Sequence, residues 1–345
     1  MRVELPRRRL TLRDVAERAG VDRSVVSRVI SGDRALSVRE STRERVQQAI
    51  RELDYRPNAQ ARSLRTARAQ AFGLLIPDFT NPIYASIIGG AELEALQHAS
   101  VLLVGSSAEQ GFRTQGFLDA LDGGRVDGLL LAGDHGSERL FSSLSRLGIP
   151  WLMLNRRASG VQRSVILDDE GAASLAVRHL VHLGHRRIGH LAGPLQADTA
   201  QRRLAGYYQA LKEAGLPSDP ALVEAADYSS SGGAAAMNRL LEQEQPPTAV
   251  FVANIASAIG ALHAARLLSL RVPDDVSVIA MHDLPLAGYL DPPLTTVRMP
   301  LEALGRRGVE LLVSHGASDP IDEVLRGPIE LVVRGSSAPP GATRR

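Results

Sequence analysis

Two short runs near the N-terminus decide the fold of that region: LRDVAERAGV at residues 12–21 and SVVSRVI at residues 24–30. The apolar residues of the first run recur at helical spacing, and Thr11 and Asp14 are residue types that cap the start of a helix. Gly20 permits a tight turn, and Asp22 can cap a second helix. The pattern predicts a helix-turn-helix.

The outer side of the second helix carries polar residues. Val26 and Ile30 fall on its inner side, which leaves Arg23, Ser24 and Arg28 facing solvent. Guanidinium groups and short hydroxyls at such positions can contact phosphates and base edges. We interpret this side as a DNA-reading face. The alternative is a small helical bundle with a basic, solvated surface.

The distribution of charge favours the DNA-reading interpretation. Residues 1–70 contain 17 Arg and 9 acidic residues, a net charge of about +8, whereas the whole chain carries +2 and the remainder therefore about −6. A basic excess confined to one region is the electrostatic signature of a nucleic-acid-binding segment, because neutralised phosphates release counterions.

Length and composition limit the remaining possibilities. The chain has 345 residues, 44% of them apolar, and no cysteine. This length predicts two or three folded units. The lack of cysteine excludes disulfides, thiolate metal sites and cysteine nucleophiles. There is neither an apolar leader nor a run of roughly 18 apolar residues, so we expect a cytoplasmic protein without a membrane span.

The elements that follow are short helices. Ser37 and Glu40 have the spacing of a capping box for a third helix, expected at residues 38–53. Pro57 ends that helix, and Asn58 can cap another helix that ends at residue 65. A helix this short needs a partner to persist in water.

From Ala71 onward, short aliphatic runs alternate with helical segments, which is typical of doubly wound parallel sheets. The expected strands are 72–76, 101–104, 128–131 and 151–154, and then, in a second series that begins near residue 165, 187–191, 249–252 and 276–280. The expected helices are 84–98, 113–121, 138–147, 172–183, 200–214, 231–243, 257–268 and 301–314. The predicted fold class is an N-terminal all-α helix-turn-helix domain followed by an α/β domain made of two doubly wound subdomains.

Polar residues follow several strands, at the edge where such sheets bind ligands. Examples are Asp78 and Asn81 after the first strand and Asn155 after the fourth. Carboxylates, amides, guanidinium groups and aromatic rings together suit vicinal hydroxyls and the apolar face of a sugar. We interpret these loops as a small-molecule site, with a sugar or polyol as one ligand class. The alternative is that loops are polar in any case.

The sequence predicts no catalytic residue, no cofactor and no metal. The first strand ends Ile76-Pro77-Asp78 without a G-x-G-x-x-G fingerprint, and neither a P-loop nor a nucleophile elbow occurs. The histidines at 179, 182, 185 and 190 lack a carboxylate at metal-site spacing, and Gly184 separates them, so we expect structural roles. We therefore expect a protein that is not an enzyme.

An ordered set of motifs between residues 11 and 334 resembles the lactose-repressor (LacI/GalR) family of bacterial transcription regulators. The matching pieces are LRDVAERAGV at 12–21, VSRVI at 26–30, TR at 42–43, YRPNAQARSL at 55–64, GHRRI at 184–188, AGP at 192–194, RLAG at 203–206 and PLTTV at 293–297. The resemblance implies a periplasmic-binding-protein-like effector domain. It also implies a homodimer that reads a near-palindromic operator in double-stranded DNA.

The resemblance assigns candidate residues to both sites. The DNA-binding candidates are Thr11, Leu12, Arg23, Ser24, Val25, Ser27, Arg28, Ser37, Asn58, Ala61 and Leu64. By analogy, Leu64 of a hinge helix at 58–64 would wedge into the minor groove. The effector-binding candidates are Asp78, Asn81, Tyr84, Asn155, Arg203, Tyr228, Asn254 and His282.

Two positions depart from the family pattern. Ile255 follows Asn254 where members usually have Asp, and His282 stands where members often have Asp. An imidazole in place of a carboxylate weakens the case for a neutral hexose and admits an acidic sugar or another anion as the effector.

The expected domains are residues 1–57 for the helix-turn-helix, 58–70 for the hinge helix and linker, and 71–334 for effector binding and dimerisation. Within the last domain, one subdomain is expected at 71–164 with 298–318 and the other at 165–297 with 319–334. Residues 335–345 have linker composition and no leucine heptads, so we expect a flexible tail and a dimer.

The leading hypothesis is a repressor that binds a palindromic operator as a dimer and is released when a carbohydrate-like effector moves the two subdomains. The alternative is a catabolite-control-type regulator that responds to a protein partner or a corepressor. A periplasmic sugar carrier would share the fold from residue 72 onward, but not the basic N-terminal region.

Overall fold

The computed structural model describes residues 10–30, 33, 36–55, 69–107, 116–119, 121, 124–133, 144 and 148–341. The chain divides into two units, Met1–Arg68 and Ala69–Arg345. The predicted hinge helix at 58–64, with candidates Asn58, Ala61 and Leu64, lies outside the described residues. Of the helix expected at 113–121, residues 116–119 and 121 are described and helical, whereas the helix expected at 138–147 lies outside the described residues except for residue 144. No helix in the described ranges is both long and apolar enough to cross a membrane.

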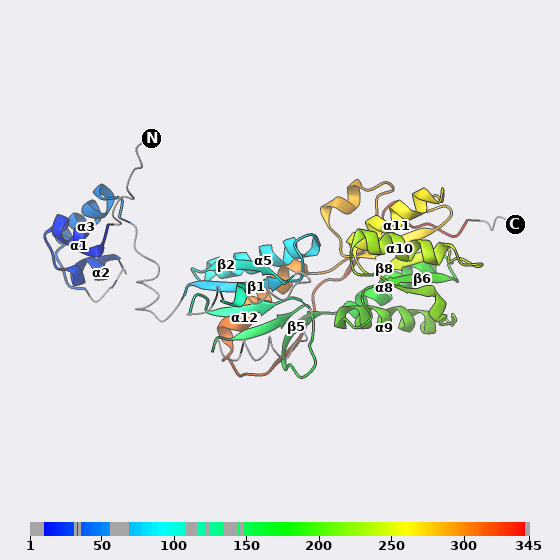
Figure 1. Ribbon diagram of the computed structural model, residues 1–345, viewed down its shortest axis with the longest axis horizontal. Helices are drawn as coiled ribbons and strands as arrows, with labels where there is room; N and C mark the ends of the chain where they lie inside the picture. Colours follow the sequence, from blue (N-terminus) through cyan, green and yellow to red (C-terminus); the bar gives the residue numbers. More distant parts are fainter. Residues whose placement is uncertain are drawn as a thin grey trace. The chain divides into compact units, whose positions relative to one another are not determined.

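The first unit is a helix-turn-helix, as predicted. It consists of α1 (Leu12–Ala19), α2 (Arg23–Ile30) and α3 (Glu40–Glu52), which enclose a small apolar core (Figure 1). The Asp14 carboxylate accepts hydrogen bonds from the Thr11 backbone N–H and hydroxyl, at 2.6 and 2.7 Å. Gly20 adopts a left-handed φ of 64°, and the Asp22 carboxylate accepts from the Ser24 N–H at 2.7 Å.

The start of the third helix differs from the prediction. Helix α3 begins at Glu40, with Arg39 as its N-cap and no side-chain cap, so the capping box expected of Ser37 and Glu40 does not form. Leu36 is buried and Val38 packs partly against the same core. Their burial holds this segment extended and delays the helix by two residues.

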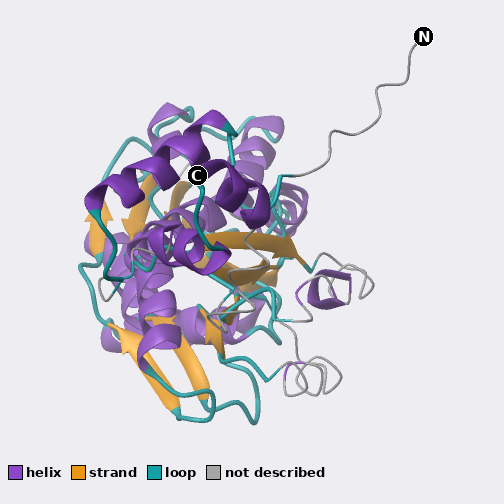
Figure 2. Cartoon of the chain, turned by 90° about the vertical axis from the view of Figure 1, so that its left-hand side faces the viewer, coloured by secondary structure: helices purple, strands orange, loops and turns teal. Residues whose placement is uncertain are grey.

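The second unit contains two sheets of six strands, flanked by helices (Figures 1 and 2). The first sheet comprises β1 (Ala71–Ile76), β2 (Val101–Ser106), β3 (Gly128–Leu131), β4 (Trp151–Leu154), β5 (Arg163–Leu167) and β11 (Ile321–Leu325). Its order is β11-β5-β4-β3-β1-β2, and every neighbouring pair is parallel. Helices α5 (Ile83–Gln97) and α12 (Leu301–Ser314) pack together on one face.

The second sheet comprises β6 (Ile188–Ala192), β7 (Val223–Ala225), β8 (Ala249–Val252), β9 (Ser277–Met281), β10 (Thr295–Arg298) and β12 (Glu330–Val332), in the order β12-β10-β9-β8-β6-β7. Only β12 is antiparallel to its neighbour. Its helices are α8 (Asp169–His182), α9 (Asp198–Glu213), α10 (Ser230–Leu241) and α11 (Ile255–Leu267), and they pack as the pairs α8–α9 and α10–α11. Two short 3₁₀ segments, η1 (Pro220–Leu222) and η2 (Pro285–Tyr289), lie in the connections.

The boundaries expected between the two subdomains need correction. Residues 163–167 form β5 of the first sheet, and residues 321–325 form β11 of the same sheet, whereas the prediction divided the chain at 165 and gave 319–334 to the other subdomain. An aliphatic run does not reveal which sheet it joins, because that depends on its neighbours in space. The chain therefore passes between the sheets three times, after β5, after β10 and after β11.

The expectation of a flexible tail is wrong for residues 335–341. Ser336 is fully buried, and its hydroxyl donates to the Val278 carbonyl at 2.7 Å and accepts from the Thr295 N–H at 2.8 Å. The Ala338 carbonyl accepts from Ser277 and contacts the His185 ring. Small residues of linker composition suit this role because they let the backbone lie directly on the sheet.

Candidate DNA-reading face and effector cavity

The polar face predicted on α2 is accessible in the structure. Arg23, Ser24 and Arg28 are exposed, while Leu12, Val25 and Ser27 are partly buried and Thr11 and Ser37 are exposed nearby in the chain. The Arg28 guanidinium pairs with the Asp33 carboxylate at 2.7 Å, and both side chains remain in contact with solvent. The face therefore presents cationic and hydroxyl groups on a helix whose opposite side is anchored in the core.

A cavity of about 110 Å³ lies where the loops of the two sheets meet in the second unit. It is lined by Pro77, Asp78, Thr80, Asn81, Tyr84, Arg156, Asp227, Tyr228 and Ala256. Four of the eight effector candidates are among these residues. Of the other four, Asn254 and Arg203 contact Tyr228, His282 contacts Arg203, and Asn155 precedes the lining residue Arg156.

The first sheet contributes three predicted residues to the cavity. Tyr84, in the first turn of α5, is buried and donates its hydroxyl to the Ala132 carbonyl at 3.3 Å; burial raises the pKa of this phenol. Asp78 accepts from the N–H and hydroxyl of Thr80, and Asn81 accepts from the Ile83 N–H. These turns fix the loop after β1.

Tyr228 forms the opposite wall. Its hydroxyl contacts the Thr199 hydroxyl at 2.9 Å, and its carbonyl accepts from the Asn254 side chain at 2.9 Å. A side chain at Gly193 would overlap the Tyr228 ring, because an added Cβ would lie 2.0 Å from Cζ. Glycine at this position lets the ring lie against the backbone, and this gives a physical reason for the AGP motif.

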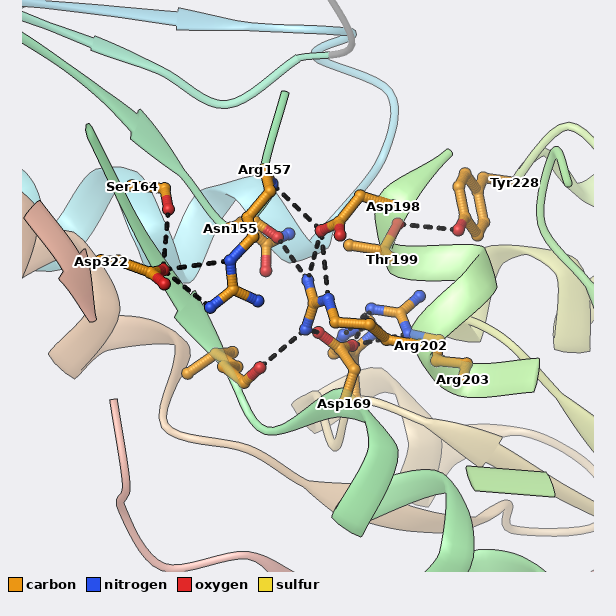
Figure 3. Close-up of polar contacts among 12 residues, drawn as sticks. Asn155, Arg157, Ser164, Asp169, Asp198, Thr199, Arg202, Arg203, Tyr228 and Asp322 are labelled. Carbon is orange, nitrogen blue, oxygen red and sulfur yellow. Dashed lines mark hydrogen bonds and ion pairs between the residues drawn. The ribbon is translucent and has the colours of Figure 1, made fainter. Parts of the chain in front are cut away.

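Arg203 is buried behind Tyr228 and bound on three sides. It donates to the Asp169 carboxylate at 2.7 Å and to the Ala253 carbonyl at 2.8 Å, and it contacts Nε2 of His282 at 3.3 Å (Figure 3 shows the Asp169 contact). Burial by itself would raise the pKa of Asp169, but Arg203 and Arg202 hold that pKa below its usual value.

His282 is neutral and has a defined tautomer. Burial, aided by the nearby Arg203 charge, lowers the pKa of this imidazole to about 3. An arginine can only donate, so Nε2 of His282 must accept and the proton must lie on Nδ1. The residue is therefore a hydrogen-bond donor at its free nitrogen and does not supply the positive charge that an anion would require.

Arg202 ties the loops of the two sheets together. It pairs with Asp169 and Asp198, and it donates to the carbonyl of Asn155 and to the carbonyl at the end of β5 (Figure 3). Asp198 in turn accepts from the backbone N–H of Arg157. Asn155, held by Arg202 and by its own N–H bond to Val165, adopts a φ of 69°.

The list of effector candidates left out several residues in and behind this cavity: Thr80, Arg156, Asp169, Arg202 and Asp227. Arg156 was recognisable, because it follows Asn155 directly in a polar loop at the end of a strand. Asp169 carried a weaker signal as an acidic residue at a helix start. Its arginine partners lie on α9, more than 30 positions further along the chain, and only the packing of α8 on α9 brings them together.

The histidines of the run at residues 179–190 contact residues of the surrounding sheet and helices. His190 stacks between Tyr207 and Phe251, at centroid distances of 5.1 and 4.7 Å, and His185 is held by Thr248 and the Ala338 carbonyl. Within the described part of the chain, no group of three His, Cys, Asp or Glu residues has a geometry that could hold a metal ion.

A helix-turn-helix unit followed by a two-sheet unit with a cavity between its loops defines a class: DNA-binding regulators with a ligand-binding domain. Comparisons with known proteins agree with this class. Bacterial regulatory proteins of the lacI family match residues 11–58, and a periplasmic binding protein-like domain matches residues 177–337.

Curated relatives align along almost the whole chain. The HTH-type transcriptional repressor CytR of Escherichia coli (strain K12) is 34% identical over 329 residues, which cover 95% of this chain and 96% of that protein. The HTH-type transcriptional regulator CelR of Thermobifida fusca is 36% identical over 341 residues, covering 96% and 99%. The chain belongs to the lacI family of bacterial regulatory proteins.

Solved structures show the same architecture. The lac repressor dimer bound to operator and the anti-inducer ONPF superimposes with a TM-score of 0.84 at 30% identity, covering 96% of this chain and 100% of that one. A transcriptional regulator CelR–cellobiose complex gives a TM-score of 0.71 at 33% identity, covering 95% and 100%. These likenesses confirm the predicted fold class and family.

Proposed function

We propose that this protein is a transcriptional repressor that binds a palindromic operator through α2 and is released when a small carbohydrate-like effector occupies the cavity. The observation that carries the proposal is the pairing of an exposed Arg23, Ser24 and Arg28 face in one unit with the cavity of the other. The relatives support it, since CytR is named a repressor and CelR has been solved with cellobiose. Because its partner is chromosomal DNA, we propose that it acts in the cytoplasm.

The proposed repressor works as a homodimer, with one recognition helix for each half-site. Exposed apolar side chains support this: Leu96 near the end of α5 is 57% exposed, and Val101 on the edge strand β2 is 56% exposed. An exposed apolar patch beside an open strand edge is a common subunit interface. Sedimentation velocity at micromolar concentration is expected to give a dimer of the 37.0 kDa chain.

The experiment that tests the function is fluorescence anisotropy on palindromes from the upstream region of its own gene, with scrambled DNA as the control. Replacing Arg23 and Arg28 with alanine is expected to remove the operator preference. The difference in binding free energy between operator and scrambled DNA should fall by about 2 kcal/mol or more, because each base-reading guanidinium contributes about 1–3 kcal/mol of discrimination. Ligand binding is expected to persist. Replacing Arg45 and Arg51, two exposed arginines on α3, with alanine is the matched control, because it removes the same two positive charges.

A second variant separates the two sites. Arg203→Ala is expected to abolish the response to effector while operator affinity remains, since Arg203 backs the Tyr228 wall of the cavity at 5.9 Å from the ring centre. Equal binding of the unmodified protein to operator and scrambled DNA would contradict the proposed function. Selective DNA binding that no small molecule affects would favour the alternative, a regulator that responds to a protein partner.

A further inference from the structure

Two buried polar atoms in consecutive residues of the loop after β4, Oδ1 of Asn155 and Nε of Arg156, have no hydrogen-bond partner among the described residues, and Nδ1 of His282, which contacts Arg203 through its other ring nitrogen, has none either. Buried polar groups in folded proteins are nearly always satisfied, so a cluster of unsatisfied ones at one place requires an explanation. Here the cluster adjoins the cavity, because Arg156 lines it and Asn155 is the preceding residue. A bound ligand would supply the missing partners.

Arg156 is the unusual member of this set because its charge is not balanced. Its neighbour Arg157 pairs with Asp322, and Arg202 pairs with Asp169 and Asp198, whereas Arg156 forms no ion pair within the described residues. Its guanidinium carbon lies 5.8 Å from the centre of the Tyr228 ring. An aromatic ring stabilises a cation but does not neutralise it.

The ion pairs behind the cavity leave no carboxylate for Arg156. Arg202 and Arg203 share Asp169, and Arg202 also pairs with Asp198. Asp78 and Asp227 line the same cavity, and neither is paired with Arg156 among the described residues. Arg156 is half-buried with a buried Nε, and a planar carboxylate is the group that its donors fit best.

The outer wall of the cavity carries carboxylates, which favour ligand hydroxyls. Asp78 and Asp227 line it, and both residues are exposed and accept hydrogen bonds within their own loops, from Thr80 and Ser229. Carboxylates at a rim can accept further bonds from ligand hydroxyls, but they repel a second negative charge. A ligand with several hydroxyls and a single negative group satisfies both the rim and Arg156.

We propose that the effector is a polyhydroxylated carboxylic acid of about one sugar ring, of the uronic or aldonic acid class. Its carboxylate binds Arg156, and its hydroxyls bind Asn155 and the rim carboxylates. The size follows from the cavity of about 110 Å³, well below the roughly 300–1,000 Å³ of sites for drug-sized ligands. The inference rests on the proposed function, since it names the ligand class of that same site.

The test uses the full-length protein and matched pairs of probes: D-glucuronate with D-glucose, D-galacturonate with D-galactose, D-gluconate with D-glucitol, and D-ribose 5-phosphate with D-ribose. Calorimetric titration gives each dissociation constant. At least one carboxylate is expected to bind tenfold or more tightly than its neutral partner. Arg156→Gln is expected to remove that preference, and Arg156→Lys to retain part of it. Arg266→Gln, an exposed arginine on α11, is the matched control.

The melting temperature provides a second measurement, separate from the calorimetric titration. Each probe that binds is expected to raise the melting temperature of the unmodified protein, by an amount that increases with the ratio of its concentration to its dissociation constant, and the carboxylates are expected to lose this effect in Arg156→Gln. Neutral sugars that bind as tightly as their acids overturn the inference, as does a preference for the phosphate ester. Failure of every carboxylate to stabilise the protein also overturns it.

Operator binding distinguishes this inference from the proposed function. A carboxylate that binds through Arg156 but leaves DNA affinity unchanged supports the inference and contradicts the function. A neutral sugar that releases the operator supports the function and overturns the inference.

Discussion

Each of the two units of this protein contains an arginine–carboxylate ion pair with the same N···O distance. Arg28 and Asp33 in the helix-turn-helix are 2.7 Å apart, and so are Arg203 and Asp169 behind the cavity. The side chains of the first pair are 44% and 34% exposed, whereas those of the second are 3% and 0% exposed. The same contact therefore occurs once in water and once in a low-dielectric interior.

The difference indicates what each pair can do. A solvated pair contributes about 0–1 kcal/mol, so Arg28 can exchange Asp33 for a phosphate or a base edge at little cost. A buried pair cannot exchange partners freely, because either charge left alone would be uncompensated. The solvated pair suits binding to a partner that comes and goes, and the buried pair suits a fixed framework behind a ligand site.

The largest expected effect comes from breaking the buried pair. Asp169→Asn leaves Arg202 and Arg203 without their shared carboxylate and is expected to lower the free energy of unfolding by about 3–5 kcal/mol. The control is Asp322→Asn, which breaks the 2.7 Å pair with Arg157 in the same unit, where the side chains are 37% and 66% exposed. Its expected cost is below about 1 kcal/mol. Equal losses in urea denaturation would contradict the contrast between buried and exposed pairs.

A smaller change in the free energy of unfolding is expected when the pH is lowered. Burial lowers the pKa of His282 to about 3, and an unfolded histidine has a pKa of about 6.5. Between these values only the unfolded chain takes up the proton, so stability falls as pH decreases below about 6.5. His282 alone is expected to remove about 2 kcal/mol between pH 7 and pH 5.

Urea denaturation at the two pH values measures this loss. His282→Asn is expected to reduce the difference in unfolding free energy between pH 7 and pH 5, whereas His263→Asn, at an exposed position on α11, is the control. If the two variants show the same pH dependence as the unmodified protein, His282 is not held neutral by burial.

The smallest effect concerns the helix-turn-helix. Asp22→Ala removes the carboxylate that accepts from the Ser24 N–H at 2.7 Å and is expected to destabilise α2 by about 1 kcal/mol. Ser37→Ala, at the position where a helix cap was expected but did not form, is predicted to change the stability of α3 by less than about 0.5 kcal/mol. Amide hydrogen exchange in the full-length chain reports on each helix separately, and faster exchange in α3 of Ser37→Ala would disprove the assignment of its start.

Much of the architecture was predictable because its signals are local. The apolar spacing of α1 and α2, the Gly20 turn and the Asp22 cap all lie within one or two helical turns. The central strands β3, β4 and β8 were predicted with their observed bounds for a similar reason, since each is a short, continuous apolar run. The strands β7, β10, β11 and β12 were not predicted, because they are short or partly polar and are defined by their neighbours in the sheet.

The sequence by itself determined the helix-turn-helix, the two-sheet class and the positions of the polar loops, because each depends on residues close together in the chain. Only the tertiary structure decided which sheet β5 and β11 join, that residues 335–341 pack on β9, and that Asp169 is shared by Arg202 and Arg203. These features depend on contacts between segments far apart in sequence. That Arg156 has no ion pair among the described residues is a result of the same kind, since it depends on the groups that folding places around this side chain.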